Sequence, residues 1–360
     1  MKRRLLHTAG LICIAAQATA STGEIVSGAH RIIPLAENVY AVEALFAGAD
    51  SAFIVNDDGV TVVDTHGSPA SAATLIDEIA KVTDVPIRYV VNTHWHVDHH
   101  SGNQAYYDAY PDGVEFIAHH ATREDIPTAG REQFLQMGPF KSMPLETADE
   151  RLAEGLDDHG RPLGDAQRRQ ITKFRDAQRS FIAAGDEFEF VLPNLTVERS
   201  LVIHGDPSPI HVLFLGRAHT RGDVVVYVPD SRIAIVGDIL TRPILWTWSS
   251  YPAAYVGTLR AIEALEIDRL VIGHGGPVLE GKEYLTSVRE SLQSIVEFAR
   301  EADARSLSPE DAIAEARSDE RVQALRQHFV EDDEQQEQMF QQMVAWTIER
   351  AMAEARGELD

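Results

Sequence analysis

The residues with the clearest potential for chemistry lie in the segment 92–100, which reads NTHWHVDHH. It holds four candidate metal ligands within six residues, directly after an apolar β-branched stretch that predicts a strand. Burying several imidazoles beside a carboxylate is costly unless the groups are paired or bound to a metal ion. Because side chains alternate along an extended chain, His94 and His96 can share one ion, whereas Asp98 and His99 suit a neighbouring ion. Imidazole and carboxylate without sulfur favour zinc, with iron or manganese as alternatives.

Three further segments place a candidate ligand where an apolar strand meets a polar or glycine-rich loop. They are residues 218–223 (AHTRGD), 236–238 (VGD) and 272–276 (IGHGG). Side chains at strand ends converge on one edge of a sheet, and glycine lets the backbone approach closely there. Each segment alone occurs by chance in many proteins, but all four in this order predict one metal site. A merely solvated histidine-rich turn leaves the other three segments unexplained.

The motif HWHVDH at residues 94–99, followed by His219, Asp238 and His274, resembles the metallo-β-lactamase-fold hydrolase superfamily. The resemblance covers roughly residues 33–277. It implies seven metal ligands: His94, His96 and His219 for a first ion, Asp98, His99 and His274 for a second ion, and Asp238 as the bridge between them. It also implies that Asp64 supports the site by accepting the free N–H of a ligand imidazole.

With aspartate at position 238, the sequence resembles the glyoxalase II and lactonase-like branch of that superfamily. Zinc β-lactamases with a cysteine ligand place that cysteine at this position and carry a lysine three residues later, where this chain has Thr241 followed by Arg242. The resemblance implies a dinuclear zinc hydrolase that uses metal-bound hydroxide to cleave a carbonyl ester, lactone, thioester or β-lactam bond. Two dications about 3.5–4 Å apart lower the pKa of a shared water, and Asp98 is the expected catalytic residue that orients it.

Two other functions stay open on the sequence. One is an iron-containing periplasmic oxidoreductase or sulfur-handling enzyme of the same fold, which the absence of a flavodoxin-like stretch disfavours. The other is a non-catalytic metal-binding protein. Structural zinc sites are usually closed by four protein ligands and often contain cysteine. Seven ligands for two ions instead leave positions open to water, which favours catalysis over a structural role.

Residues that follow Asp238 are candidates for binding a small-molecule substrate. Trp246 and Trp248, together with Tyr251, either line an apolar wall of the substrate site or pack in the core. Arg242 either pairs with a substrate carboxylate or forms a structural salt bridge. The sequence leaves both pairs of alternatives open.

Strands precede helices twice along the chain, which predicts an α/β fold with two sheets and outer helices, a four-layer αββα sandwich. The resemblance implies the same architecture. In the first half, strands are expected at 39–42, 51–55, 60–63, 88–91 and 113–118, with a helix at 69–81. In the second half, strands are expected at 211–215, 224–228, 233–236 and 270–272, with a helix at 255–265.

The predicted organisation is a signal peptide at 1–20, a metallo-β-lactamase-fold domain at 21–280 with a helical insertion at about 121–185, and C-terminal helices at 281–360. The insertion carries an apolar stripe of Ile171, Phe174, Phe181 and Ile182. A stripe on the last helix consists of Met339, Phe340, Met343, Val344 and Ile348. This second stripe indicates either core packing or a contact in a homodimer.

The composition of the chain limits the kinds of molecule that it is expected to bind. The chain has 360 residues, 44% of them hydrophobic, and its 32 basic and 56 acidic residues give a net charge of −24. Because a surface this acidic repels the phosphate backbone of nucleic acids, no nucleic-acid partner is expected.

The first twenty residues are typical of a secretory signal peptide, so we expect a periplasmic or secreted protein. Basic residues at 2–4, an apolar stretch at 9–16 and the small residues at 18–20 form that signal. The apolar stretch is far shorter than the ~20 residues that span a bilayer, and no other stretch is long enough. Cys13 is the single cysteine and would leave with the signal peptide.

Overall fold

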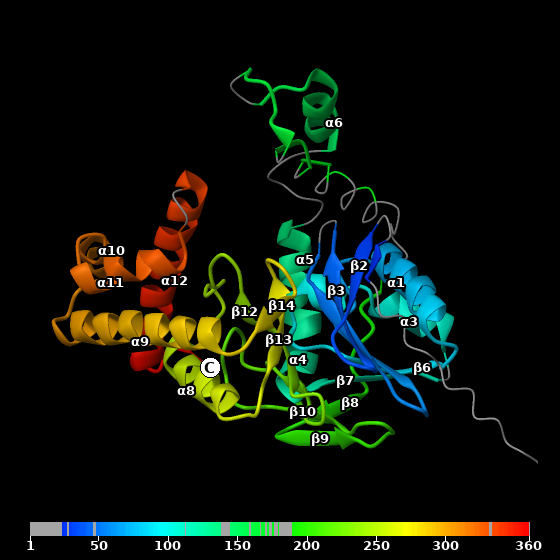
Figure 1. The fold of residues 1–360 in the computed structure, drawn as a ribbon. Coiled ribbons are helices and arrows are strands. Elements are labelled where there is room, and N and C mark those ends of the chain that lie inside the picture. Colours follow the sequence, from blue (N-terminus) through cyan, green and yellow to red (C-terminus); the bar gives the residue numbers. More distant parts are fainter. Residues whose placement is uncertain are drawn as a thin grey trace, which may run out of the picture.

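The computed structural model describes residues 24–359, except for 27–28, 46–47, 112, 138–144, 158–159, 166, 170, 173–174, 176–178, 180–188 and 331–332. The predicted signal peptide lies outside the described residues, as do Phe174, Phe181 and Ile182 of the insertion. Figure 1 shows two sheets with helices on their outer sides.

The first sheet has eight strands that follow one another in chain order, β1 to β8. They are Ile25–Val26, His30–Pro34, Val39–Ala44, Ser51–Val55, Val60–Val63, Ile87–Val91, Glu115–His119 and Leu195–Val197. Strands β1 to β5 pair antiparallel, and β5 to β8 pair parallel. The carboxyl ends of the parallel strands therefore meet at one edge.

The second sheet has six strands in the order β14-β13-β12-β11-β10-β9. From β9 to β14 they are Ser200–Ile203, Ile210–Leu213, Val225–Val228, Ile233–Thr241, Arg269–His274 and Val278–Glu280. Strands β12 and β13 pair parallel, and the other neighbours pair antiparallel.

Side chains alternate between the two faces of each sheet and so build the layers. In β4, Ala52 and Ile54 pack between the two sheets, whereas Phe53 packs against the helices outside the first sheet. In β12, Ile235 packs between the sheets and Val236 packs against the helices outside the second sheet. Strands that are apolar on both faces are typical of sheets covered on both sides. The predicted four-layer αββα sandwich is confirmed.

Helices cover the outer face of each sheet. The helices against the first sheet are α1 (Pro69–Val82) and α3 (Asn103–Ala109). Those against the second sheet are α8 (Pro252–Glu263), α9 (Glu283–Ala304) and α12 (Glu334–Ala355). Between α9 and α12 lie α10 (Pro309–Ala316), α11 (Glu320–Ala324) and the 3₁₀ helix η4 (Leu325–His328).

The apolar stripe of the last helix packs in the core of the second sheet. Phe340, Met343, Val344 and Ile348 are buried there together with residues of α8 and α9. Core packing therefore explains the stripe, and a homodimer stays a prediction. None of the described helices combines the length and apolar character that a membrane crossing requires.

Several short strands were not expected from the sequence. The last strand expected from the sequence is 270–272, but Val278–Glu280 also forms a strand, β14, against β13. Strands β1, β2, β8 and β9 were also missed. Most of these have four residues or fewer, which is too short for an alternating pattern to be distinct. Conversely, β12 extends to Thr241, five residues beyond the expected end.

The described part of the insertion between β7 and β8 is largely helical. It consists of α4 (His120–Asp125), the π-helical turn η1 (Ile126–Gly130), α5 (Arg131–Met137) and α6 (Leu145–Glu154). The elements α4, η1 and α5 follow one another without a break, and α4 contacts β7.

Candidate metal centre

The first four candidate ligands lie directly after β6. His94 and His96 lie in the loop, and Asp98 and His99 lie in the short helix α2 (Val97–His100). The three histidines are buried, whereas Asp98 is partly exposed. The rings of His94 and His96 lie 4.7 Å apart, so both imidazoles point to one place.

Buried amides hold the turn into α2. The Asn92 side chain donates to the backbone carbonyl of His99 at 3.3 Å and to Asn103 Oδ1 at 3.0 Å. The Asn103 amide donates back to Asn92 at 2.8 Å, and the Thr65 hydroxyl donates to Asn103 at 2.9 Å. This network fixes the end of β6 against the start of α3.

Asp238 reaches the site from an irregular part of β12. The strand shifts its register against β13 at Gly237 and again before Thr241. Gly237 has φ +52°, a region that favours glycine. At Gly273 on β13, a Cβ atom would lie 1.9 Å from Asp238 Oδ1. Glycine at both positions therefore lets the bulged strand direct the Asp238 carboxylate into the site.

The remaining two candidates come from other strand ends of the second sheet. His219 lies in the loop between β10 and β11, and His274 is the last residue of β13. The Asp223 carboxylate folds the His219 loop by accepting the backbone N–H of Thr220 at 2.7 Å and its hydroxyl at 3.1 Å.

Asp238 lies between two pairs of histidines. Its Oδ2 lies 3.5 Å from His219 Nε2 and 3.9 Å from His94 Nε2. Its Oδ1 lies 3.2 Å from His99 Nε2 and 3.5 Å from His274 Nε2. The two oxygens of one carboxylate thus face different histidine pairs, which is the geometry that a bridge between two ions requires.

All seven predicted ligands come together in two groups, within each of which the ligand atoms lie within 4.8 Å of one another. One group consists of His94, His96, His219 and Asp238, and the other of Asp98, His99 and His274. In the second group, Asp98 Oδ2 lies 3.2 Å from His274 Nε2. The division is the one that the resemblance implied, and the role of each residue as a ligand stays a prediction.

The chemistry of the cluster fits divalent cations. Within the described chain, His94 Nε2, His99 Nε2 and Asp238 Oδ1 are buried without a hydrogen-bond partner. Such atoms are costly in a folded protein, and cations between them would satisfy all three. Burial, reinforced by neighbouring imidazoles, lowers the pKa of His94 and His96 well below the ordinary value. Both are therefore neutral, the form that binds metal.

Asp64 lies directly behind the ligand imidazole of His99. Its carboxylate accepts the backbone N–H of Thr93 at 2.8 Å, the Thr93 hydroxyl at 2.7 Å and the Nδ1–H of His99 at 2.7 Å. Asp64 is buried and has φ +62°, at the turn that follows β5. The bond fixes the His99 ring with Nε2 towards Asp238, as a supporting carboxylate should.

We expect Asp64→Asn to weaken binding of the second metal ion by about 10–100-fold, because a supporting carboxylate orients its ligand imidazole. Competition with a chromophoric chelator measures both affinities. Asp319→Asn is the matched control, since Asp319 caps α11 and touches no candidate ligand. Equal loss at both ion sites, or no loss at either, would contradict the assignment of Asp64 to His99.

The two tryptophans that the sequence singled out lie in different surroundings. The indole of Trp248 stacks on the imidazole of His96, with ring centroids 4.8 Å apart and planes 15° apart. Trp246 instead packs partly buried against the core of the second sheet and lies 5.9 Å from the Trp346 ring. Core packing therefore describes Trp246, and the substrate role stays a prediction for Trp248.

Arg242 lies at the rim beside His274. Its backbone N–H donates to the His274 carbonyl at 3.0 Å, and its exposed guanidinium lies 4.6 Å from the centroid of the Tyr284 ring. Of the two alternatives for Arg242, the structural salt bridge is absent among the described residues, where the guanidinium makes this cation–π contact instead. A role in binding a substrate carboxylate stays a prediction.

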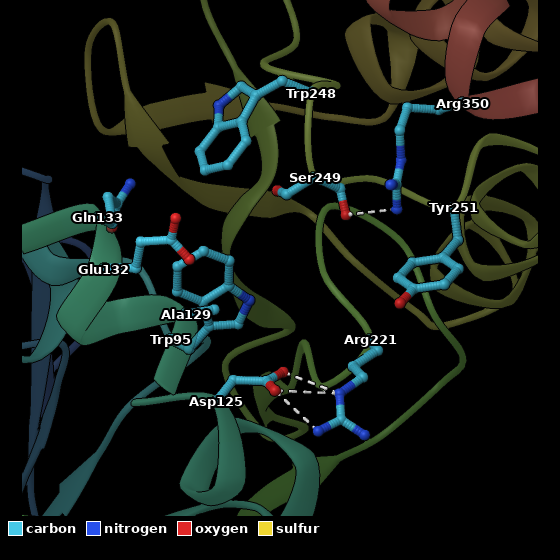
Figure 2. Close-up of a pocket in the computed structure, with 10 residues that line it drawn as sticks. All are labelled: Trp95, Asp125, Ala129, Glu132, Gln133, Arg221, Trp248, Ser249, Tyr251 and Arg350. Atoms are coloured by element: carbon cyan, nitrogen blue, oxygen red, sulfur yellow. Dashed lines mark hydrogen bonds and ion pairs between the residues drawn. The ribbon is translucent and has the colours of Figure 1, made fainter. Parts of the chain in front are cut away.

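A pocket of about 420 Å³ adjoins the cluster, within the range of small-molecule sites. Figure 2 shows its lining residues, which are Trp95, Asp125, Ala129, Glu132, Gln133, Arg221, Trp248, Ser249, Tyr251 and Arg350. Sequence reasoning named Trp248 and Tyr251 alone. Trp95 carried a signal, because it lies between two ligand histidines. Arg350 carried none, since it lies 74 residues after the last ligand motif, which ends at Gly276.

The model of the metallo-beta-lactamase superfamily matches residues 46–274 of this chain. The match spans most of the sandwich and every candidate ligand, so the chain belongs to the metallo-β-lactamase superfamily. The glyoxalase II-like branch within it stays a prediction.

Among curated proteins, the chain is similar to a linear primary-alkylsulfatase from Pseudomonas sp. (strain ATCC 19151), with 24% identity over 260 residues. The match covers 68% of this chain but only 43% of that protein. Among solved structures, it is similar to a metallo-β-lactamase from Erythrobacter litoralis, at 19% identity and a TM-score of 0.49, over 75% of this chain and 99% of the other. Superfamily membership and the sulfatase similarity point to a metal-dependent hydrolase, as the sequence predicted.

Proposed function

We propose that this chain is a metal-dependent hydrolase with a dinuclear zinc centre. The observation that carries the proposal is the position of Asp238, whose two carboxylate oxygens face two different histidine pairs at 3.2–3.9 Å. His94, His96 and His219 would hold one ion, and Asp98, His99 and His274 the other. Two bound dications would supply Lewis acidity and lower the pKa of a water toward neutrality.

Asp98 is the proposed catalytic residue, because it lies on the open side of the cluster. Its side chain is 31% exposed, whereas that of Asp238 is 5% exposed. A carboxylate there reaches both the solvent and His274 Nε2, 3.2 Å away. Asp98 can therefore accept a hydrogen bond from the attacking water and orient it.

The proposed substrates are carbonyl esters, lactones, thioesters and β-lactams. An aromatic wall at Trp95 and Trp248 suits the apolar part of such a molecule. Sulfate esters are a second candidate class, which the similarity to an alkylsulfatase favours. That relative is more than twice as long as the matched segment, so its activity names a substrate class to test.

Export is the third part of the proposal. The basic, apolar and small-residue segments of positions 1–20 support a signal peptide and a periplasmic or secreted location. A reporter that is active only after export tests this part when it is fused to residues 1–24. The control is the same fusion with Arg3 and Arg4 replaced by glutamate.

The metal and the reaction are tested together. We expect elemental analysis to find about two zinc ions per chain, since the cluster offers seven ligands for two ions. Activity on a panel of ester, lactone, thioester, β-lactam and sulfate ester should vanish with chelation and return with zinc. A metal content well below two with activity that survives chelation would refute the proposal. Iron in the site together with oxygen uptake would favour the oxidoreductase instead.

A further inference from the structure

Two tryptophans that line the pocket contact the candidate ligand His96. Trp248 stacks on this imidazole, and Trp95 meets it edge-on with ring centroids 4.3 Å apart. Trp248 is 37% exposed, although its side chain is large and apolar. The apolar part of a substrate therefore finds the exposed Trp248 ring, with the buried Trp95 beside it, next to a candidate metal ligand.

The C-terminal helix α12 contributes a cation to this pocket. Figure 2 shows Arg350 extending towards Ser249 and Tyr251, on the side of the pocket away from Glu132. Its Nε donates to the Ser250 carbonyl at 2.7 Å, and its Nη2 donates to the Ser249 carbonyl at 3.3 Å. The guanidinium also lies 5.4 Å from the Tyr251 ring centroid. These contacts hold the charge in one position before any ligand binds.

The two pocket cations differ in how their charge is balanced. Arg221 is neutralised, because its guanidinium contacts Asp125 at 2.7–3.2 Å and Glu124 at 3.0 Å. Arg350 donates to backbone carbonyls, and among the described residues it forms no ion pair with a carboxylate. An anion that enters the pocket therefore finds its available positive charge at Arg350.

The carboxylate on α12 that acts most directly on the charge of Arg350 is engaged elsewhere. The Glu354 carboxylate, one helical turn further along α12, accepts the backbone N–H groups of Ala253 and Ala254 at 2.7 and 3.1 Å. Burial lowers the pKa of Arg350, and Tyr251 and Glu354 offset this only in part. Since a guanidinium stays protonated in proteins, Arg350 is a partly desolvated cation that an anionic ligand would stabilise.

One residue joins Arg350 to the metal cluster. The Ser249 hydroxyl lies 3.3 Å from His96 Nε2 and donates to the His219 carbonyl at 3.0 Å, while the Ser249 carbonyl accepts from Arg350. The guanidinium is thus at a fixed separation from the place where the ligands converge. A substrate that reaches both would pass the Trp248 ring beside His96, which favours an apolar spacer between its anionic group and its scissile bond.

We propose that Arg350 binds the carboxylate of an amphiphilic substrate, whose apolar spacer lies on Trp95 and Trp248 and whose ester, thioester or lactam bond lies at the cluster. This rests on the proposed function and narrows its substrate class. It gives to Arg350 the role that the sequence suggested for Arg242, whose guanidinium lies over Tyr284.

Two esters of equal chain length test the proposal in the zinc-loaded protein. One is the p-nitrophenyl monoester of adipic acid, and the other is p-nitrophenyl hexanoate, which ends in a methyl group in place of the carboxylate. We expect wild type to prefer the adipate ester in kcat/KM by about 10-fold or more, the size of one charge-assisted contact. Arg350→Met should bring this ratio close to one, mainly through KM.

The control variant changes another arginine near the end of α12, and a second variant changes Arg350 itself to a different residue. Arg356→Met removes a guanidinium six residues later on the same helix, where it pairs with Asp303 at 2.7 Å, and should keep the wild-type ratio. Arg350→Gln removes the charge but can still donate to the Ser250 carbonyl, so it replaces the methionine variant if that one fails to fold. Loss of the ratio in Arg242→Met, with Arg350→Met unchanged, overturns the proposal.

Direct binding separates this proposal from the hydrolytic function. Hexanoate should quench the fluorescence of the pocket tryptophans in wild type, and its Kd should rise about 10-fold in Arg350→Met and not in Arg356→Met. If neither ester is cleaved while hexanoate binding still depends on Arg350, carbonyl hydrolysis is wrong and the recognition role stands. Hexanoate binding that is the same in wild type and Arg350→Met overturns the role, whether or not the esters are cleaved.

Discussion

Asp238→Ala should reduce bound metal from about two ions per chain to less than one and slow hydrolysis by about 10³-fold or more, because the metals supply several kcal/mol of the catalysis. Its two oxygens face different histidine pairs, so its removal affects both ions at once. Two dications close together also repel each other strongly, and the bridging anion offsets that repulsion. Elemental analysis and steady-state kinetics with added zinc measure the two effects.

A neighbouring aspartate provides the control for this experiment. Asp230 lies in the exposed turn between β11 and β12, and Asp230→Ala should leave metal content and activity at wild-type levels. Asp238→Ala should stay folded by circular dichroism, since alanine removes the carboxylate without adding atoms to the buried site. Retention of two ions by Asp238→Ala would rule out the bridging role.

Gly273→Ala should inactivate the protein although glycine contributes no ligand. The added Cβ would lie 1.9 Å from Asp238 Oδ1 and 3.0 Å from the Gly237 carbonyl carbon. Relief requires either that the carboxylate turns away from the histidines or that β12 separates from β13, and overpacking of this kind costs about 1–3 kcal/mol. We expect metal content to fall with activity, which should drop by about 10²-fold or more, the loss for a displaced catalytic group.

A glycine in open space separates this steric effect from the general effect of a methyl group. At Gly257, in α8, no other atom lies within 4 Å of the position that a Cβ would take. Gly257→Ala should keep full activity and stabilise the helix by up to about 1 kcal/mol. Circular dichroism and the Tm of both variants show whether Gly273→Ala is folded. A folded Gly273→Ala protein with wild-type metal content would contradict the close approach of Gly273 to Asp238.

The elements that position the candidate ligands were predictable because their signals are local. Strands β4 and β5 have the expected bounds, since each is an apolar run closed by a turn. The segment 94–99 holds four ligands in a single turn, so its spacing alone indicates a metal site. His219, Asp238 and His274 each follow an apolar strand, and strand ends meet at one edge of a sheet.

Short strands and the bulge in β12 were harder to predict. A strand such as Val278–Glu280 has three residues, and its pairing with β13 stabilises it more than its own sequence does. The bulge that directs Asp238 depends on contacts of Gly237 and Gly273 with residues from other segments, which no local pattern records.

By itself the sequence determined which side chains can hold metal, in what order they occur and that two sheets carry them, because those properties follow from spacing and periodicity along the chain. Only the tertiary structure decided that Asp64 lies behind His99, that Trp246 packs against the core while Trp248 stacks on His96, and that Arg350, unlike Arg221, has no carboxylate partner within the described part of the chain. These facts depend on contacts between segments up to 152 residues apart (248 − 96), and such contacts form only when the outer helices pack on the sheets.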